Sequence, residues 1–278
     1  MEGIIMVVQH NLQAANTNRM LSANVKAVSK ATEKLSSGYA VNRAADDAAG
    51  LSISEKMRNQ IRGINQAVKN SEDGISAIQT AEGNLNEIHS ILQRMGELAN
   101  KAANDINATE DREAIAAEMT ELQTEIDSIA TKAQFNGTTL LDGTFTGKQL
   151  QVGANSGENM EISIDAMNTS GLSLAGASAI DVSTHSAASA TMSRVTNAIK
   201  LVSAARSSLG AKQNRLEYTV NNLKNYSENL TSAESQIRDT DMASEMSNYT
   251  KNNILQQAAQ SMLTQANQST QGVLSLLQ

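Results

Sequence analysis

Apolar positions along most of the chain recur in alternating steps of three and four residues, which is the spacing of one helix face. The longest series runs from Met57 to Ala99 and changes phase once, near Ala81. Such steps over many turns are typical of a coiled-coil seam. We therefore predict one helix from about residue 44 to 104, roughly 90 Å long at about 1.5 Å per residue, and hence a rod.

Other seams flank this helix. An N-terminal series ends at a stop signal, Ser36-Ser37-Gly38, and consists of Leu21, Val25, Val28 and Leu35. A second rod helix should begin with Thr109 as its N-cap. Because the loop at 104–108 is short, this helix should fold back antiparallel on the first. A further seam runs from Val195 to Ile237.

The last segment, 240–278, has few charges and many glutamines. Its sparse apolar face consists of Met242, Met246, Tyr249, Leu255, Met262, Val273 and Leu276. A helix of this kind is too weakly amphipathic to stand alone. We expect it to be buried in an assembly.

Between the helices the pattern changes to that of short strands. Asn136-Gly137 and Asp142-Gly143 are turn dipeptides, and residues 149–152 and 160–164 alternate with a period of two. We predict a small β-hairpin region over 134–166. The Ser/Thr-rich stretch 167–193 shows little periodicity, and we expect it to be a surface loop.

Composition supports a mainly α fold. The chain has no proline, cysteine or tryptophan, and aromatic residues make up 2% of it, which argues against a thick spherical core. Without cysteine there is no disulfide or thiolate metal site. We predict terminal coiled-coil segments at 1–47 and 239–278, and a helical rod with antiparallel helices at 48–238.

Charge and hydropathy exclude several function classes. The net charge of −7 disfavours binding to nucleic acid or to an anionic membrane. No apolar run approaches the roughly 20 residues that span a bilayer. The apolar run at residues 4–8 follows Glu2 and is too short for a secretory signal, and Met6 is an alternative initiator.

Candidate catalytic chemistry is weak. His10, His89 and His185 fall on different elements and lack the spacing of metal ligands. Residues 143–149 are one residue short of a phosphate loop and end in glutamine. Asp46-Asp47 is most simply a helix cap. We therefore predict no enzyme activity and no catalytic, cofactor-binding or metal-binding residues.

Two readings of the helical pattern remain. One is a self-contained helical adaptor or secreted coiled-coil protein that forms no filament. The other is a polymer subunit, favoured because amide-rich, charge-poor segments lie at both ends of the chain, where a soluble bundle usually carries charges. The candidate assembly residues are Leu21, Val25, Val28, Leu35, Met246, Leu255, Met262, Val273 and Leu276.

Specific motifs resemble bacterial flagellin. They are Leu35-Ser36-Ser37-Gly38, the stretch Asn42-Arg43-Ala44-Ala45-Asp46-Asp47, Gln134-Phe135-Asn136-Gly137, the segment 209–216 and the ending 254–277. The match covers roughly residues 6–145 and 190–278, so the chain resembles a short flagellin without outer variable domains. The resemblance implies a subunit that polymerises into the bacterial flagellar filament for swimming motility, with both ends paired in the filament core and disordered in the monomer.

The resemblance also implies partners and a location. These are a homopolymer, a flagellin export chaperone, the flagellar type III export apparatus, the hook–filament junction and the filament cap. The protein would be extracellular, in the flagellum, exported without a cleaved signal peptide. No cofactor is implied.

A further implied partner is the host innate receptor Toll-like receptor 5. The segment Gln93–Ala99 is similar to the flagellin stretch that this receptor recognises. The resemblance assigns Gln93, Arg94, Leu98 and Glu118 to the contact. The alternative is that Arg94 is an ordinary solvated charge and that Leu98 widens the core.

Overall fold

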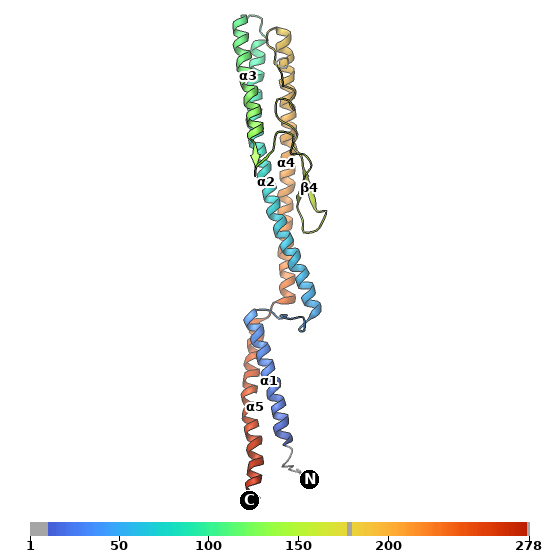
Figure 1. Ribbon diagram of the computed structural model, residues 1–278, viewed down its shortest axis with the longest axis vertical. Coiled ribbons are helices and arrows are strands. Elements are labelled where there is room, and N and C mark those ends of the chain that lie inside the picture. The colour runs from blue at the N-terminus through green and yellow to red at the C-terminus, as the bar shows by residue number, and fades with distance from the viewer. Residues whose placement is uncertain (1–10, 177–179, 277–278) are drawn as a thin grey trace. The chain divides into compact units, whose positions relative to one another are not determined.

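The computed structural model describes residues 11–176 and 180–276, with side chains described up to Ser269 (Figure 1). Its helices are α1 (Leu12–Ser37), α2 (Ala48–Ala102), α3 (Thr109–Lys132), α4 (His185–Arg238) and α5 (Met242–Leu276). Its strands are β1 (Gln134–Phe135), β2 (Thr138–Thr139), β3 (Lys148–Gln151) and β4 (Asn159–Ile162). The predicted mainly helical class with a small β region is confirmed.

The chain forms two units, which are described separately. The first contains residues 1–59 and 230–278, and the second contains residues 60–229. This division falls inside α2 and α4, whereas the sequence suggests boundaries at 47/48 and 238/239. Each long helix therefore contributes to both units.

The core of the second unit is the predicted seam of α2 packed against α3 and α4. Leu85, Leu92 and Met95 of α2 are completely buried, as are Met119 of α3 and Val202 of α4. Apart from Leu98, the residues that α2 contributes to this core follow one another in steps of three and four: Ile78, Ala81, Leu85, Ile88, Leu92, Met95, Ala99 and Ala102. Burying a large aliphatic side chain contributes about 1.5–3 kcal/mol, so this stripe holds the three helices together.

Two antiparallel strand pairs form the predicted β region. Asn136 and Gly137 both have positive φ, 50° and 76°, as a tight turn between β1 and β2 requires. In the second pair Lys148 lies opposite Ile162. Met160 and Ile162 are buried while Glu161 between them is exposed, so the period-two pattern places one face of β4 on the core.

The stretch 167–193 differs from the expected surface loop. Leu172, Leu174 and Val182 are buried, and α4 already begins at His185. The Asp127 carboxylate of α3 accepts hydrogen bonds from the backbone N–H and the hydroxyl of Thr169, at 2.8 and 2.9 Å. The expectation was wrong because a few apolar side chains can pin a chain to a helix without any periodic pattern.

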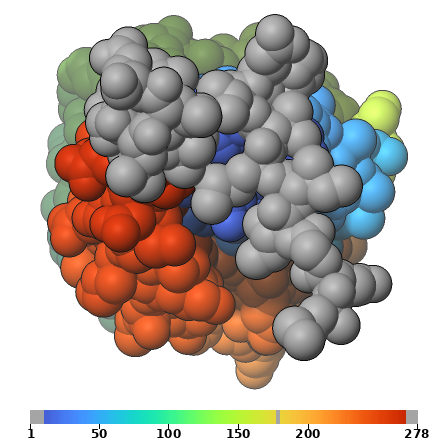
Figure 2. Space-filling model, turned by 90° about the horizontal axis from the view of Figure 1, so that it is seen from below, coloured from blue at the N-terminus to red at the C-terminus, as the bar shows by residue number. Residues whose placement is uncertain are grey.

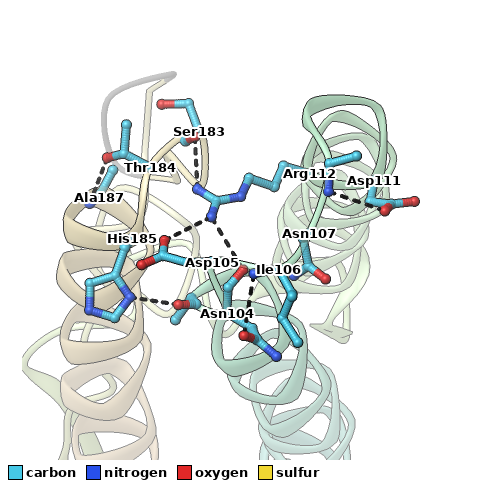
Figure 3. Close-up of polar contacts among 12 residues, drawn as sticks. Asn104, Asp105, Ile106, Asn107, Asp111, Arg112, Ser183, Thr184, His185 and Ala187 are labelled. Atoms are coloured by element: carbon cyan, nitrogen blue, oxygen red, sulfur yellow. Dashed lines mark hydrogen bonds and ion pairs between the residues drawn. The ribbon is translucent and has the colours of Figure 1, made fainter.

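The turn between α2 and α3 is tied to the chain before α4 by Arg112 (Figure 3). Its guanidinium donates to the carbonyls of Ser183 and Asn104, at 3.0 and 3.2 Å, and pairs with Asp105 at 3.2 Å. A nitrogen of His185 lies 2.6 Å from the carbonyl oxygen of Ala103. These contacts fix where α4 starts.

The predicted N-cap of α3 was wrong by one residue. Ala108 occupies the cap position and Thr109 is the first helical residue. The Asp111 carboxylate accepts from the backbone N–H of Ala108 at 3.3 Å, so an acid in the first turn replaces the expected hydroxyl cap.

Candidate functional site

The two ends of the chain meet in the first unit, where α1 packs along α5 (Figure 1). At one end of the pair, the side-chain amide of Asn11 donates to the carbonyl of Ala266 at 3.0 Å. At the other end, the N–H of Thr240 donates to the carbonyl of Gly38 at 2.9 Å. The helices are therefore antiparallel, and residues more than 200 positions apart in sequence become neighbours.

The junction beside this pair is built around Arg238. Gly38 ends α1 with φ of 77°, a left-handed cap, and lets the chain turn so that Ala40 donates to the Arg238 carbonyl at 2.7 Å. The Arg238 guanidinium lies 4.6 Å from the centre of the Tyr39 ring and 2.7 Å from a Glu55 oxygen. That hydrogen bond is the main cause that lowers the pKa of Glu55.

The motif at 42–47 has two structural roles. The Asp47 carboxylate accepts from the backbone N–H groups of Ala49 and Gly50, at 3.0 and 2.9 Å, and so caps α2 as the sequence suggests. Asp46 instead pairs with Lys30 of α1 at 2.8 Å. The hydrogen bond from Lys30 is the main cause that lowers the pKa of Asp46. The motif therefore joins the start of α2 to the terminal pair.

The faces that α1 and α5 turn towards each other bury little apolar surface. Among the described side chains of these two helices, only Ala31 and Ala266 are buried. The half-buried positions of α5 recur mostly every three or four residues, and most of them are polar or small: Glu245, Tyr249, Asn252, Asn253, Gln256, Ala259 and Leu263. Ala266 ends this series and is buried. The pair therefore has only a thin core of its own.

Large apolar side chains lie outside that contact instead. We call the following residues the assembly surface: Leu12, Met20, Val25, Met242, Met246, Ile254, Leu255 and Met262, whose exposed fractions run from 42% to 76%. Figure 2 shows part of the open surface of α5 in orange-red. This distribution is the reverse of that in the second unit, where the seam is buried.

The assembly surface extends around α5. Successive helical residues are about 100° apart, so Met242 and Met246 lie on one flank of the α1-facing side and Leu255 and Met262 on the other. Ile254 lies on the far side by the same geometry. One flat partner cannot cover all three directions, so burying these side chains requires neighbours on several sides.

The candidate assembly residues named from the sequence fall into three groups. Val25, Met246, Leu255 and Met262 belong to the assembly surface. Leu21, Val28 and Leu35 are half-buried in the α1–α5 pair. Val273 and Leu276 lie in α5, but their side chains are outside the described ones.

Sequence reasoning missed some members of the assembly surface. Leu12, Met20 and Ile254 lie off the seam, so a search for one periodic stripe passes over them. The available signal was a large apolar residue at a position where the helical period calls for a polar one.

A second candidate surface lies on the second unit, where Arg94 of α2 faces Glu118 of α3. Both Nε and Nη2 of Arg94 donate to the same Glu118 oxygen, at 3.0 and 2.9 Å. Glu97 accepts from Nη1 at 3.3 Å. The hydrogen bond to Glu118 is the main cause that raises the pKa of Arg94. Both side chains stay about half exposed, so this charged pair is open to a partner.

The other two residues assigned to this surface differ from each other. Gln93 is exposed, and its amide nitrogen lies 3.1 Å from a ring nitrogen of His89. Leu98 is 3% exposed and belongs to the helical core. The structure therefore contradicts the expectation that the Leu98 side chain is available for contact, because its position beside the seam turns it inwards.

Within the described residues, no group of three or more histidine, aspartate or glutamate side chains could hold a metal ion. None of the described helices has the length and apolarity needed to cross a bilayer.

Comparison with known proteins identifies the family. The model of the bacterial flagellin N-terminal helical region matches residues 8–146, and that of the C-terminal helical region matches residues 192–277. Together these matches span α1 to β2 and most of α4 and α5. The chain belongs to the bacterial flagellin family.

Two flagellar proteins can be aligned with this sequence over nearly its whole length. A flagellin of Halalkalibacterium halodurans is 53% identical over 272 residues, covering 98% of this chain and all of the relative. The flagellar filament 31.3 kDa core protein of Treponema maltophilum is 44% identical over 286 residues, with 98% and 100% covered. The crystal structure of Bacillus cereus flagellin has a TM-score of 0.50 and 30% identity, covering 56% of this chain and 88% of that one.

The two flagellin regions meet in the terminal pair. Helix α1 lies within the N-terminal match and α5 within the C-terminal match. Between the matches, residues 147–191 contain β3, β4 and the stretch pinned to Asp127. The assembly surface is thus built from both flagellin regions, whereas the connecting segment belongs to the second unit.

Proposed function

We propose that this chain is a structural subunit that polymerises through the assembly surface into a flagellar filament for swimming motility. The observation that carries the proposal is the distribution of apolar side chains in the first unit: among the described residues of α1 and α5 no large apolar side chain is fully buried, while those of the assembly surface are exposed. Membership of the flagellin family supports the proposal, and the Treponema maltophilum relative is named a flagellar filament core protein.

The energetics favour burial by neighbouring copies. Fully burying an exposed large aliphatic side chain contributes about 1.5–3 kcal/mol, and Ile254 and Leu255, which are 60% and 42% exposed, would each gain roughly half of that. The thin core of the α1–α5 pair gives little stability to the isolated helices, so we propose that these ends order on assembly, when neighbours cover them. The alternative, a self-contained helical adaptor, predicts a monomer that stays soluble at every concentration.

The test is polymerisation of purified protein, followed by sedimentation and electron microscopy. Ile254→Asp with Leu255→Asp places charges on two sides of α5, and we expect it to abolish filaments. The control is Ile106→Asp, which adds one such charge at an apolar residue 86% exposed in the second unit. Filaments from the double variant, or a wild-type chain that stays monomeric, would refute the proposal.

The same surface suggests how the subunit is handled before assembly. We propose that a flagellin export chaperone covers α5, and that the chain leaves through the flagellar type III export apparatus without a cleaved signal peptide. The hook–filament junction and the filament cap would then receive it outside the cell. The exposed apolar residues of α5 support this, because an uncovered surface of that kind promotes aggregation. Loss of chaperone binding on deleting residues 241–278 would be the expected result, and unchanged binding would contradict it.

We also propose that the monomer is a ligand of Toll-like receptor 5 through Gln93, Arg94 and Glu118. The support is the similarity of residues 93–99 to the family's recognised stretch, together with the exposed, mutually oriented Arg94–Glu118 pair. Arg94→Ala with Glu118→Ala should weaken direct binding to the receptor ectodomain. The control is Arg58→Ala, which removes a half-buried arginine of the same helix that pairs with Glu55. Unchanged affinity of the double variant would remove these residues from the contact.

A further inference from the structure

The methionines described on α1 and α5 differ in exposure from those of the second unit. In the second unit Met95, Met119, Met160 and Met167 are at most 4% exposed, and only Met192 reaches 36%. On α1 and α5 all four described methionines are at the surface, with 48–60% of each side chain exposed: Met20, Met242, Met246 and Met262. We call these four the surface methionines.

Exposure decides the order in which these sulfurs react. The chain contains no cysteine, so the methionine thioether is its most readily oxidised sulfur group. Oxidation turns a flexible apolar side chain into a polar, chiral sulfoxide. A buried thioether such as Met119 is shielded by the helices around it, whereas the surface methionines can meet a dissolved oxidant directly.

The surface methionines are also placed where a polar group would interfere with contact between copies. Met242 and Met246 lie on one flank of α5 and Met262 lies on the other. Met20 lies on a flank of α1, beside the half-buried Leu21. Oxidation would thus place a strong hydrogen-bond acceptor on several sides of the terminal pair, each within the assembly surface.

We propose that the surface methionines are oxidation sites through which a peroxide reversibly blocks assembly of the subunit. The inference rests on the proposed polymerisation. In the reaction, the sulfur lone pair attacks one peroxide oxygen, an S–O bond forms and the O–O bond breaks. The leaving hydroxyl group takes up the proton of the hydroxyl oxygen that was transferred to sulfur, and it departs as water. Sulfur loses two electrons and hydrogen peroxide gains them.

The consequence for assembly follows from burial. A sulfoxide oxygen enclosed between copies without a donor loses its hydrogen bonds to water, and one such unpaired group weakens an association by about tenfold. We therefore expect peroxide treatment of the monomer to raise its critical concentration for polymerisation by at least about tenfold. Enzymatic reduction of the sulfoxides restores the thioethers and should restore assembly.

The first experiment treats monomeric full-length protein with hydrogen peroxide. Peptide mass spectrometry follows each sulfoxide, and sedimentation gives the critical concentration. The surface methionines should oxidise before Met95, Met119, Met160 and Met167, and assembly should fall in step with them. Treatment with both methionine sulfoxide reductases should return the critical concentration to its starting value. Equal oxidation of the buried methionines, or no recovery after reduction, would overturn the inference.

A variant then separates these sulfurs from other peroxide damage. Replacing all four surface methionines by leucine keeps their apolar character and nearly their volume. This variant should polymerise equally before and after peroxide, while the control Met192→Leu should stay as sensitive as the wild type. If the leucine variant fails to assemble even without peroxide, the reductase experiment on the wild type tests the inference instead. Recovery of assembly after reduction supports it, and no recovery overturns it.

The outcomes separate this inference from the function on which it rests. If untreated wild-type protein forms no polymer, the proposed function fails. If it polymerises, and the oxidised protein polymerises at the same critical concentration, the function stands and the oxidation switch is refuted.

Discussion

Two glycines of α2 provide a direct test of how the β3–β4 hairpin packs on this helix within the second unit. At Gly63 an added Cβ would lie 2.9 Å from the Cβ of Ala154 and 3.3 Å from its Cα, in the turn between the strands. At Gly83, on the same helix, an added Cβ would meet nothing within 4 Å. The same substitution to alanine therefore gains the same helix propensity at both sites and causes a clash at only one.

The magnitudes set the sign of each effect. Replacing a helix-interior glycine by alanine stabilises by about 1 kcal/mol. Overpacking a close contact costs about 1–3 kcal/mol, and the atoms of Ala154 include backbone, which cannot rotate away as a side chain can. Gly83→Ala should therefore raise the free energy of unfolding by about 1 kcal/mol, while Gly63→Ala should leave it unchanged or lower it by up to about 2 kcal/mol.

Thermal unfolding followed by circular dichroism measures the difference. For a unit of this size, 1 kcal/mol shifts the Tm by about 2–4 °C, so the two variants should differ by about 2–12 °C. Adding Ala154→Gly to Gly63→Ala removes one of the two clashing Cβ atoms and should recover part of the loss. If Gly63→Ala stabilises as much as Gly83→Ala, the hairpin does not pack on α2 as described.

Three further predictions concern the core, the terminal pair and the C-terminal helix. Leu92→Ala, at a fully buried seam position, should lower the free energy of unfolding by about 2–5 kcal/mol, measured by urea titration. Because Lys30 lowers the pKa of Asp46, this pair stabilises the first unit above the ordinary aspartate pKa, and the stabilisation is lost as pH falls through the lowered value. Asp46→Asn should therefore remove part of the acid sensitivity of α1–α5 helicity, and an unchanged acid titration would contradict this. Deleting residues 241–278 should abolish polymerisation while the second unit still unfolds cooperatively, as followed by sedimentation and circular dichroism.

The seam of α2 shows how much of the fold local pattern decides. Leu85, Leu92 and Met95 could be assigned to the core from spacing alone, because a helix turns through a fixed angle per residue and needs an apolar stripe to pack. The turn at Asn136-Gly137 was equally readable, since positive φ at two successive residues favours these residue types. Such features depend only on near neighbours in the sequence.

The loop before α4 shows what local pattern cannot decide. Leu172 and Leu174 are buried because the side chain of Asp127 holds Thr169 against α3, and no period in the sequence encodes that contact. The resemblance assigned Leu98 to the receptor contact, yet its side chain is 3% exposed and belongs to the helical core. Burial at the edge of a stripe depends on how many helices surround it.

The amino-acid sequence by itself determined the helices, the turns and the sparse apolar character of both ends of the chain. Only the tertiary structure decided which of those apolar residues pack within the first unit and which face outwards. Met20 and Leu21 are adjacent in sequence, but Leu21 is half-buried and Met20 is exposed, because a partner helix reaches only one side of α1. The direction from which a distant segment approaches is a property of the folded chain, and it is what separates the assembly surface from the interior of the pair.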